Sequence, residues 1–196
     1  DSFGPALLDN MRAQGVGVAH VRMDADAASG IALITVDAAG ENTIVVAPGA
    51  NGRVDLEDLA AARDLLAGAR YLIMQFEIPL AVVRAAIVMA RELGVRVILN
   101  PAPAYTVEPG FLEGVHCLVA NETEAERLTG APVTDLASAE RAGRALLALS
   151  IPVAIITLGA QGALLVTAEG AVHIPARAVQ AVDTTGVTPM SHARDV

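Results

Sequence analysis

The chain has 196 residues, of which 54% are hydrophobic, 18% charged and only 3% aromatic. This length and composition predict one well-buried domain with a core of Ala, Val, Leu and Ile, and they exclude intrinsic disorder. The formal net charge of −9 excludes binding of nucleic acid through a broad basic face, so any anionic ligand must be held locally.

The first part of the chain predicts a helix, a strand and a hairpin. Residues 5–14 place Leu7, Leu8 and Met11 on one helical face, and a strand is expected near residues 18–22. The β-rich runs 31–36 and 43–47 are joined by turn-forming residues, which indicates a hairpin.

Helices and strands alternate from residue 55 onward. We predict helices over 55–66, 79–93, 122–129 and 136–149, and strands over 71–76, 95–99, 115–119 and 153–158. The runs YLIMQF and VRVILN are typical of strands covered on both faces. The alternation predicts a three-layer, Rossmann-like α/β fold with a mainly parallel sheet flanked by helices. The segments 163–167, 172–175 and 179–182 are expected to form an antiparallel edge.

An uncharged stretch at residues 145–168 is long enough to resemble a membrane span. Pro152, Gly159 and Gly162 divide it into a helix end, a strand, a turn and a second strand, so we predict no membrane span. The first ten residues do not have the pattern of a signal peptide. The single cysteine, Cys117, lies in an apolar run, where we expect a buried, inert thiol of a reducing compartment.

Polar residues follow the predicted strands where a ligand of an open α/β sheet binds. They are Glu77, Asn100, Asn121 and Thr157. Three of them, Glu77, Asn121 and Thr157, have an ordinary structural explanation beside a functional one. Glu77 is either a solvated loop acid or an acceptor for ligand hydroxyl groups, and the TLGAQG turn after the last strand is either a tight β-turn or a phosphate-binding loop.

The stretch ANETEAERLTG also has two explanations. Asn121 is suited to cap the helix that follows, with Glu122 and Glu124 in its first turn. The same spacing places Asn121 and Glu124 on one side at a strand end, where they can position Mg²⁺ through water. Both explanations remain open from the sequence.

Taken together, six stretches resemble the ribokinase, or PfkB-type, carbohydrate kinase family, and they occur in the family's order. The resemblance covers the chain up to Gly186, and the segments NPAPA and PGAN favour the ribokinase branch over the fructokinase, adenosine kinase and ketodeoxygluconate kinase branches. The stretches are SGIALITVDAAGENTIVVAPGAN (29–51), QFEIPL (75–80), VILNPAPA (97–104), NETEAERLTG (121–130), ITLGAQGALL (156–165) and AVDTTG (181–186).

The resemblance implies a cytoplasmic kinase that uses ATP, Mg²⁺ and a monovalent cation (K⁺) to phosphorylate a sugar hydroxyl, with D-ribose giving ribose 5-phosphate. It implies that residues 1–23 hold a helix and a strand of the core, that residues 24–52 form a β-hairpin lid able to pair in a homodimer, and that residues 53–196 form the nucleotide-binding core. Neither nucleic acid nor a membrane is expected as a partner. The site residues implied are Glu77 for the sugar, Asn121 for the phosphates, Glu124 for Mg²⁺ through water, Thr157, Leu158, Gly159, Ala160, Gln161 and Gly162 for the nucleotide, and Asp183 and Thr185 for the monovalent cation.

The sequence departs from the family where the catalytic base belongs. Family members continue after Thr-Thr-Gly to a Gly-Asp pair, whose Asp deprotonates the sugar hydroxyl, whereas here Pro189 stands at that place and neither His192 nor Asp195 is a convincing substitute. We therefore assign no catalytic residue. The chain resembles an internal fragment, which also lacks the family's N-terminal segment, and frameshift, truncation and divergence each explain its tail.

Two other functions remain for comparison. A non-catalytic kinase remnant would bind nucleotide or a partner subunit without turnover. A dinucleotide-dependent dehydrogenase is disfavoured because no G-x-G-x-x-G segment follows an early strand.

Overall fold

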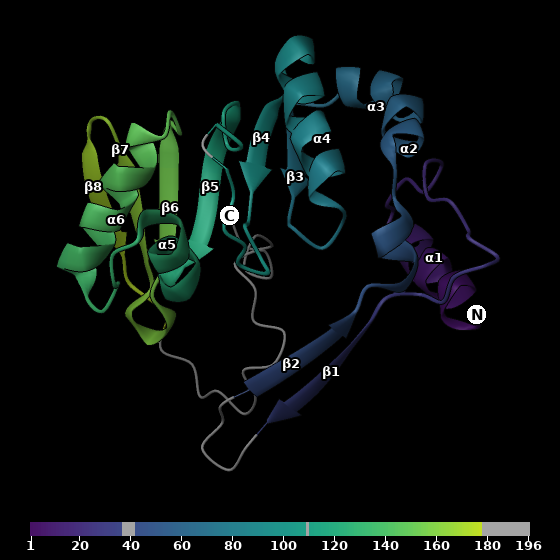
Figure 1. Ribbon diagram of the computed structural model, residues 1–196, viewed down its shortest axis with the longest axis horizontal. Coiled ribbons are helices and arrows are strands. Elements are labelled where there is room, and N and C mark those ends of the chain that lie inside the picture. The colour runs from purple at the N-terminus through teal and green to yellow at the C-terminus, as the bar shows by residue number, and fades with distance from the viewer. Residues whose placement is uncertain (37–41, 109, 178–196) are drawn as a thin grey trace.

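The computed structural model describes residues 1–36, 42–108 and 110–177. Its main feature is a six-stranded sheet in the order β3-β4-β5-β6-β7-β8 (Figure 1). The first four strands of this sheet run parallel, and the last two are antiparallel. The strands are β3 (Tyr71–Met74), β4 (Arg96–Leu99), β5 (Val115–Asn121), β6 (Val153–Thr157), β7 (Ala163–Thr167) and β8 (Gly170–Ile174).

Three amphipathic helices connect the parallel strands. They are α4 (Leu80–Leu93), α5 (Glu122–Thr129) and α6 (Leu136–Ala148). Each strand lies next to the one before it and in the same direction, so right-handed crossovers place all three helices on one face of the sheet. The predicted α/β fold, with a mostly parallel sheet flanked by helices, is confirmed.

Burial along the strands follows from this arrangement. In β6, Ala154 and Ile156 are buried, whereas their neighbours Val153 and Ile155 are only partly buried. In β3 at the sheet edge, Tyr71 and Ile73 are exposed. The expectation that YLIMQF is covered on both faces is therefore wrong for the described residues. The exposed positions alternate along β3, so they share one face of the sheet, and the crossover helices cover the other face.

Helix α6 packs closely on the antiparallel part of the sheet. A Cβ atom added at Gly143 would overlap the side chain of Val166, so this glycine lets the helix approach β7. Leu146 on the same face of α6 is fully buried. The antiparallel pairing of β7 and β8 confirms the predicted edge, and the predicted strand at 179–182 lies outside the described residues.

The N-terminal part of the chain lies beside this core (Figure 1). It contains α1 (Phe3–Ala13), β1 (Ile31–Val36), β2 (Asn42–Ala47), the 3-10 turn η1 (Gly49–Arg53), α2 (Leu56–Ala61) and α3 (Arg63–Ala67). The predicted hairpin is confirmed: β1 and β2 form a separate antiparallel sheet that projects away from the six-stranded one. The predicted helix over 55–66 is two short helices, which meet at Ala62.

The strand expected near residues 18–22 does not form, which corrects the prediction that residues 1–23 include a strand of the core. The segment makes a turn in which the Val21 amide donates to the Val18 carbonyl at 3.1 Å. Arg22 then makes two hydrogen bonds to the Asp58 carboxylate, at 2.7 and 2.8 Å. These contacts hold the segment against the start of α2, away from a sheet edge.

The apolar stretch 145–168 is divided as predicted into the end of α6, β6, a turn and β7. In the described ranges, none of the helices has the length and apolar character needed to span a membrane. Cys117 in β5 is buried, and this burial raises the pKa of its thiol to about 11. The expected burial of the thiol is confirmed, and the raised pKa disfavours the nucleophilic thiolate.

Candidate functional site

The carboxyl edge of the parallel strands gathers the predicted polar residues. The Asn100 amide, directly after β4, donates to the Met74 carbonyl at the end of β3 at 2.9 Å. Asn121 at the end of β5 is in register with Thr157 at the end of β6. Neighbouring strands lie about 4.8 Å apart, so β3 and β6 are separated by roughly 14 Å at this edge. Groups at the four strand ends can therefore contact one extended ligand.

Asn121 and Glu124 bind each other at the start of α5. The Glu124 amide donates to Asn121 Oδ1 at 2.8 Å, and the Asn121 amide donates to Glu124 Oε2 at 2.9 Å. This is a capping box, in which the two side chains satisfy backbone N–H groups at the helix start. In addition, Asn121 Nδ2 donates to Glu124 Oε1 at 3.1 Å. The capping explanation of this motif is confirmed, and it fixes both side chains at the strand edge.

Asn100 also belongs to this site, although no ligand or partner could be assigned to it from the sequence. Its Nδ2 group donates to the Val119 carbonyl at 2.9 Å and to Glu124 Oε2 at 3.1 Å. Its polar character directly after an apolar strand was the only available signal, because the contact depends on the pairing of β4 with β5. Asn100, Asn121, Glu124 and Thr157 are called the strand-edge cluster below.

Burial governs the electrostatics of Glu124, which is only 8% exposed. Desolvation raises the pKa of its carboxyl group, while the hydrogen bonds from Asn121 and Asn100 act in the opposite direction and nearby Glu122 raises the pKa further. The side chain is thus a buried carboxylate that depends on its amide partners to remain charged.

The strand-edge cluster fits a hydrated Mg²⁺ ion better than a directly bound one. Among the described residues, no three His, Cys, Asp or Glu side chains converge as metal ligands. The Glu124 carboxylate has about four lone-pair sites and accepts three hydrogen bonds, which leaves about one site on Oε1. Mg²⁺ usually keeps several of its waters, and one such water can donate to this free site.

The segment from Thr157 to Gly162, called the glycine loop below, follows β6 at the same edge. It contains the 3-10 turn η2 (Gly159–Gln161), and the Leu158 amide donates to the Gly162 carbonyl at 2.8 Å. Gly159, Ala160 and Gln161 are exposed, whereas Leu158 is buried and anchors the loop. The loop therefore presents three exposed residues at the end of β6, next to Asn121 at the end of β5.

Strand β8 supports the glycine loop through contacts with Gln161 and Gly162. His173 Nε2 lies 2.7 Å from the Gln161 carbonyl oxygen. Gly162 has a φ angle of 94°, and a Cβ atom there would overlap the Ile174 carbonyl oxygen. A side chain at Gly162 would push the loop away from this support.

Glu77 faces the base of the β1–β2 hairpin. It lines a pocket of about 150 Å³ whose other walls come from both hairpin strands and the turn that follows them. Glu77 follows β3, whereas the other lining residues lie 26 (77 − 51) to 47 (77 − 30) positions earlier in the chain. These other lining residues are Gly30, Ile31, Ala32, Val46, Ala47, Pro48 and Asn51.

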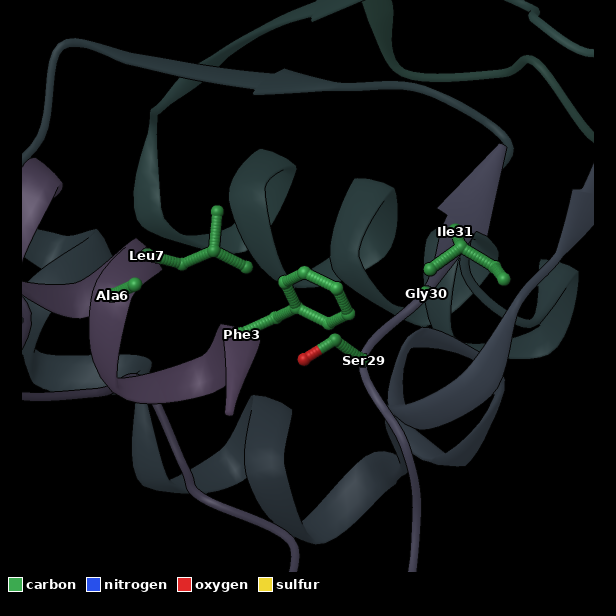
Figure 2. Close-up of a pocket in the computed structure, with 6 residues that line it drawn as sticks. All are labelled: Phe3, Ala6, Leu7, Ser29, Gly30 and Ile31. Carbon is green, nitrogen blue, oxygen red and sulfur yellow. The ribbon is translucent and has the colours of Figure 1, made fainter. Parts of the chain in front are cut away.

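A larger pocket of about 300 Å³ lies between α1 and the entry to β1 (Figure 2). Phe3 and Leu7 of α1 line one side, and Ser29 to Ile31 line the other. Its walls are almost wholly apolar, and the one hydroxyl group, on Ser29, already donates to Asp1 at 3.0 Å. This pocket is therefore poorly suited to a sugar, whose hydroxyl groups require several polar partners.

Asp183 and Thr185, which the family resemblance implies for a monovalent cation, lie outside the described residues. The other predicted site residues form two groups. Asn121, Glu124, Thr157 and the rest of the glycine loop lie together. Glu77 follows β3 at the same edge, two strands from β5 and three from β6, and lines the pocket at the hairpin base.

The fold and the strand-edge cluster define an α/β protein with a candidate ligand site at the carboxyl edge of a mostly parallel sheet. A family model described as pfkB family carbohydrate kinase matches residues 1–187. The chain therefore belongs to the pfkB family of carbohydrate kinases.

Two curated relatives and one solved structure illustrate what this chain is similar to. The chain is 40% identical over 191 residues to a ribokinase of Mus musculus. The matched region is 95% of this chain and 58% of the relative. The chain is 35% identical over 187 residues to a deoxyribokinase of Salmonella typhimurium, covering 95% of this chain and 61% of the relative. The structure of Arabidopsis thaliana ribokinase complexed with ribose and ATP matches with a TM-score of 0.75 at 27% identity, covering 88% of this chain and 56% of that one. The chain thus spans 56–61% of the length of these proteins.

Proposed function

We propose that this chain derives from a kinase that transfers the γ-phosphoryl group of ATP to a sugar hydroxyl, with D-ribose as substrate and ribose 5-phosphate as product. The observation that carries this proposal is the strand-edge cluster, in which amide, carboxylate and hydroxyl groups lie beside an exposed glycine loop. The similarity to ribokinases favours ribose. Because a deoxyribokinase is also similar, 2-deoxyribose is the competing sugar.

In this proposal the sugar binds between the core and the hairpin. The Glu77 carboxylate accepts hydrogen bonds from sugar hydroxyl groups in the pocket at the hairpin base. Residues 24–52 act as a lid over that pocket, next to a helix in residues 1–23 and a nucleotide-binding core in residues 53–196. Closing such a lid would exclude water from the reacting groups.

The nucleotide binds along the other half of the edge. Exposed backbone of the glycine loop holds phosphate oxygens, and Asn121 orients the phosphates from the end of β5. Glu124 would hold a hydrated Mg²⁺ ion through one of its waters, and the bound ion would neutralise phosphate charge. Asp183 and Thr185 are proposed to hold the monovalent cation.

We propose that this chain turns over slowly because it has no general base. Residues 187–196 carry Val-Thr-Pro where the family has a Gly-Asp pair. Loss of a general base alone typically lowers the rate by about 100- to 10,000-fold. The binding groups described above are separate from that base and are expected to function without it.

An assay of ADP release by the purified chain tests this proposal. We expect calorimetry to detect binding of ADP with Mg²⁺, and a coupled assay to detect little ADP release with ATP and D-ribose. Substantial ribose-dependent release would contradict the proposed impairment, and no nucleotide binding would contradict the kinase site itself. The variant Glu77→Gln, measured with D-ribose and 2-deoxyribose, is expected to weaken sugar binding and leave ADP binding unchanged.

A second candidate function is a non-catalytic remnant that binds nucleotide or a partner subunit. The observation in its favour is the hairpin, where Leu33 and Val45 are 68% and 63% exposed and every residue of β1 is exposed. Such an apolar surface is typical of a contact with another chain, including a second copy of this one. Nucleotide binding without turnover, together with a dimer in analytical ultracentrifugation that Leu33→Asp abolishes, would support this candidate.

A further inference from the structure

We propose that Asn100 is a positioning residue for the hydrated Mg²⁺ ion, and that it acts by holding the Glu124 carboxylate in place. This inference rests on the proposed nucleotide site and adds to it a residue from a different strand. Asn100 comes from the end of β4, whereas Asn121 and Glu124 come from the junction of β5 and α5.

The hydrogen bonds of Asn100 fix the orientation of its amide. Its Nδ2 group has two acceptors, the Val119 carbonyl at 2.9 Å and Glu124 Oε2 at 3.1 Å. Rotating the amide by half a turn would place Oδ1 against two other acceptor oxygens, so only one orientation is stable. Nδ2 therefore links the β5 backbone and the carboxylate at the same time.

This link determines which oxygen of Glu124 faces the site. Oε2 is fully engaged by Asn100 and the Asn121 amide, and Oε1 accepts only from Asn121 Nδ2. The free lone pair is thus on Oε1. Without Asn100, the Glu124 carboxylate would still accept from the backbone amide and from Nδ2 of Asn121. It would lose the hydrogen bond from Asn100, which comes from another strand. The carboxylate could then rotate within the capping box.

The core groups around Asn100 show why an amide is needed here. Its backbone is held by the Met74 carbonyl, and Leu99 beside it is fully buried. A neutral donor can approach a buried carboxylate in such surroundings at little cost, whereas a second carboxylate would be repelled. Partners that orient a metal-binding group in this way typically change metal affinity by about 10- to 100-fold when removed.

Calorimetry with ADP, in Mg²⁺ and in EDTA, tests the proposal without requiring turnover. We compare the wild-type chain with Asn100→Ala, Glu124→Gln and the double variant, and we use Asn10→Ala on the exposed face of α1 as the matched control. We expect Asn100→Ala to weaken ADP binding by about 10- to 100-fold in Mg²⁺ and to leave ADP binding in EDTA unchanged. We expect it to have no further effect in the Glu124→Gln background, because it acts through that residue.

The possible outcomes separate a failure of the proposed function from a failure of the role proposed for Asn100. If the wild-type chain does not bind ADP, the proposed function fails and this inference fails with it. If the wild-type chain binds ADP in a Mg²⁺-dependent way and Asn100→Ala does the same, only the inference is overturned. A loss that is equal with and without Mg²⁺, or that is additive with Glu124→Gln, would show a merely structural role. Circular dichroism verifies folding, and Asn100→Ser, which keeps a small donor, replaces Asn100→Ala if the latter does not fold.

Discussion

The Nε2 atom of His173 lies 2.7 Å from the carbonyl oxygen of Gln161, so a side chain of β8 supports the tip of the glycine loop. The carbonyl group can only accept, which means that the imidazole nitrogen donates its proton. This contact couples the antiparallel edge of the sheet to the proposed nucleotide site, although the two residues are twelve positions apart in the chain.

Replacing His173 by alanine is expected to loosen the loop. A hydrogen bond of this kind contributes about 0.5–1.5 kcal/mol, so ADP binding should weaken by about 2- to 12-fold. Hydrogen exchange of the loop amides should become faster while exchange in β5 stays unchanged. His173→Gln retains a donor and should recover part of the affinity, and His20→Ala in an exposed turn serves as the control. Equal exchange rates in all variants would show that the contact does not support the loop.

The two glycines of the loop are expected to differ in their tolerance of alanine. Both have positive φ angles, 51° at Gly159 and 94° at Gly162, but only Gly162 has neighbouring backbone within reach of a Cβ atom. Gly159→Ala should cost roughly 1–2 kcal/mol of stability, the usual penalty for a left-handed non-glycine residue. Gly162→Ala should cost more, because the loop must also move away from Ile174. Urea denaturation of the two variants measures this difference, and equal losses would contradict the close packing.

The sequence allowed most of the six-stranded sheet to be predicted, because short apolar runs and helical periodicity are local features. It failed for residues 18–22, where Val18 and Val21 suggested a strand but the ion pair of Arg22 with Asp58 holds the segment against α2. That contact joins residues 36 positions apart, and no local pattern contains it. The break between α2 and α3 at Ala62 likewise has no glycine or proline to mark it.

The candidate site shows the same division between local and distant contacts. The capping box of Asn121 and Glu124 is visible in the sequence as a spacing of three residues. The link from Asn100 to Glu124 depends on the register of β4 with β5, which shifts between Val97 and Ile98. The pocket that joins Glu77 to the hairpin base depends on where the hairpin folds back. The sequence could therefore place polar residues at the strand ends, but it could not identify the residues that they contact.

Two of the three capping boxes in the described residues, those of α5 and α6, allow the structural and functional roles of Asn121 to be separated. Asp135 caps α6 by accepting from the Ser138 amide at 2.7 Å, and it is not a member of the strand-edge cluster. Asn121→Ala and Asp135→Ala should each destabilise the fold by about 1 kcal/mol, the typical cost of a lost N-cap. Only Asn121→Ala should also weaken ADP binding in Mg²⁺. Calorimetry and thermal melting of both variants measure the two effects, and similar ADP affinity in both would remove Asn121 from the proposed site.

Glu124 makes the stability of the fold depend on pH. Burial raises the pKa of its carboxyl group above the usual value of 4.5 in the folded state. The folded state therefore holds this proton at a pH where the unfolded chain has released it, so the contribution to stability is fully present below pH 4.5 and is lost as pH rises through the folded pKa. Glu124→Gln cannot lose a proton, so its stability relative to the wild-type chain should increase as pH rises.

Urea denaturation from pH about 4 to about 7.5, without Mg²⁺ or nucleotide, measures this trend. The glutamine side chain also changes one hydrogen bond, because its NH₂ group cannot accept from Asn121, and this adds an offset that is the same at every pH. The slope, and not the offset, therefore reports the buried carboxylate. Glu126→Gln on the exposed side of α5 is the matched control and should show no comparable slope. A difference between Glu124→Gln and the wild-type chain that stays constant across the range would mean that the carboxylate is not held in an environment that disfavours its charge.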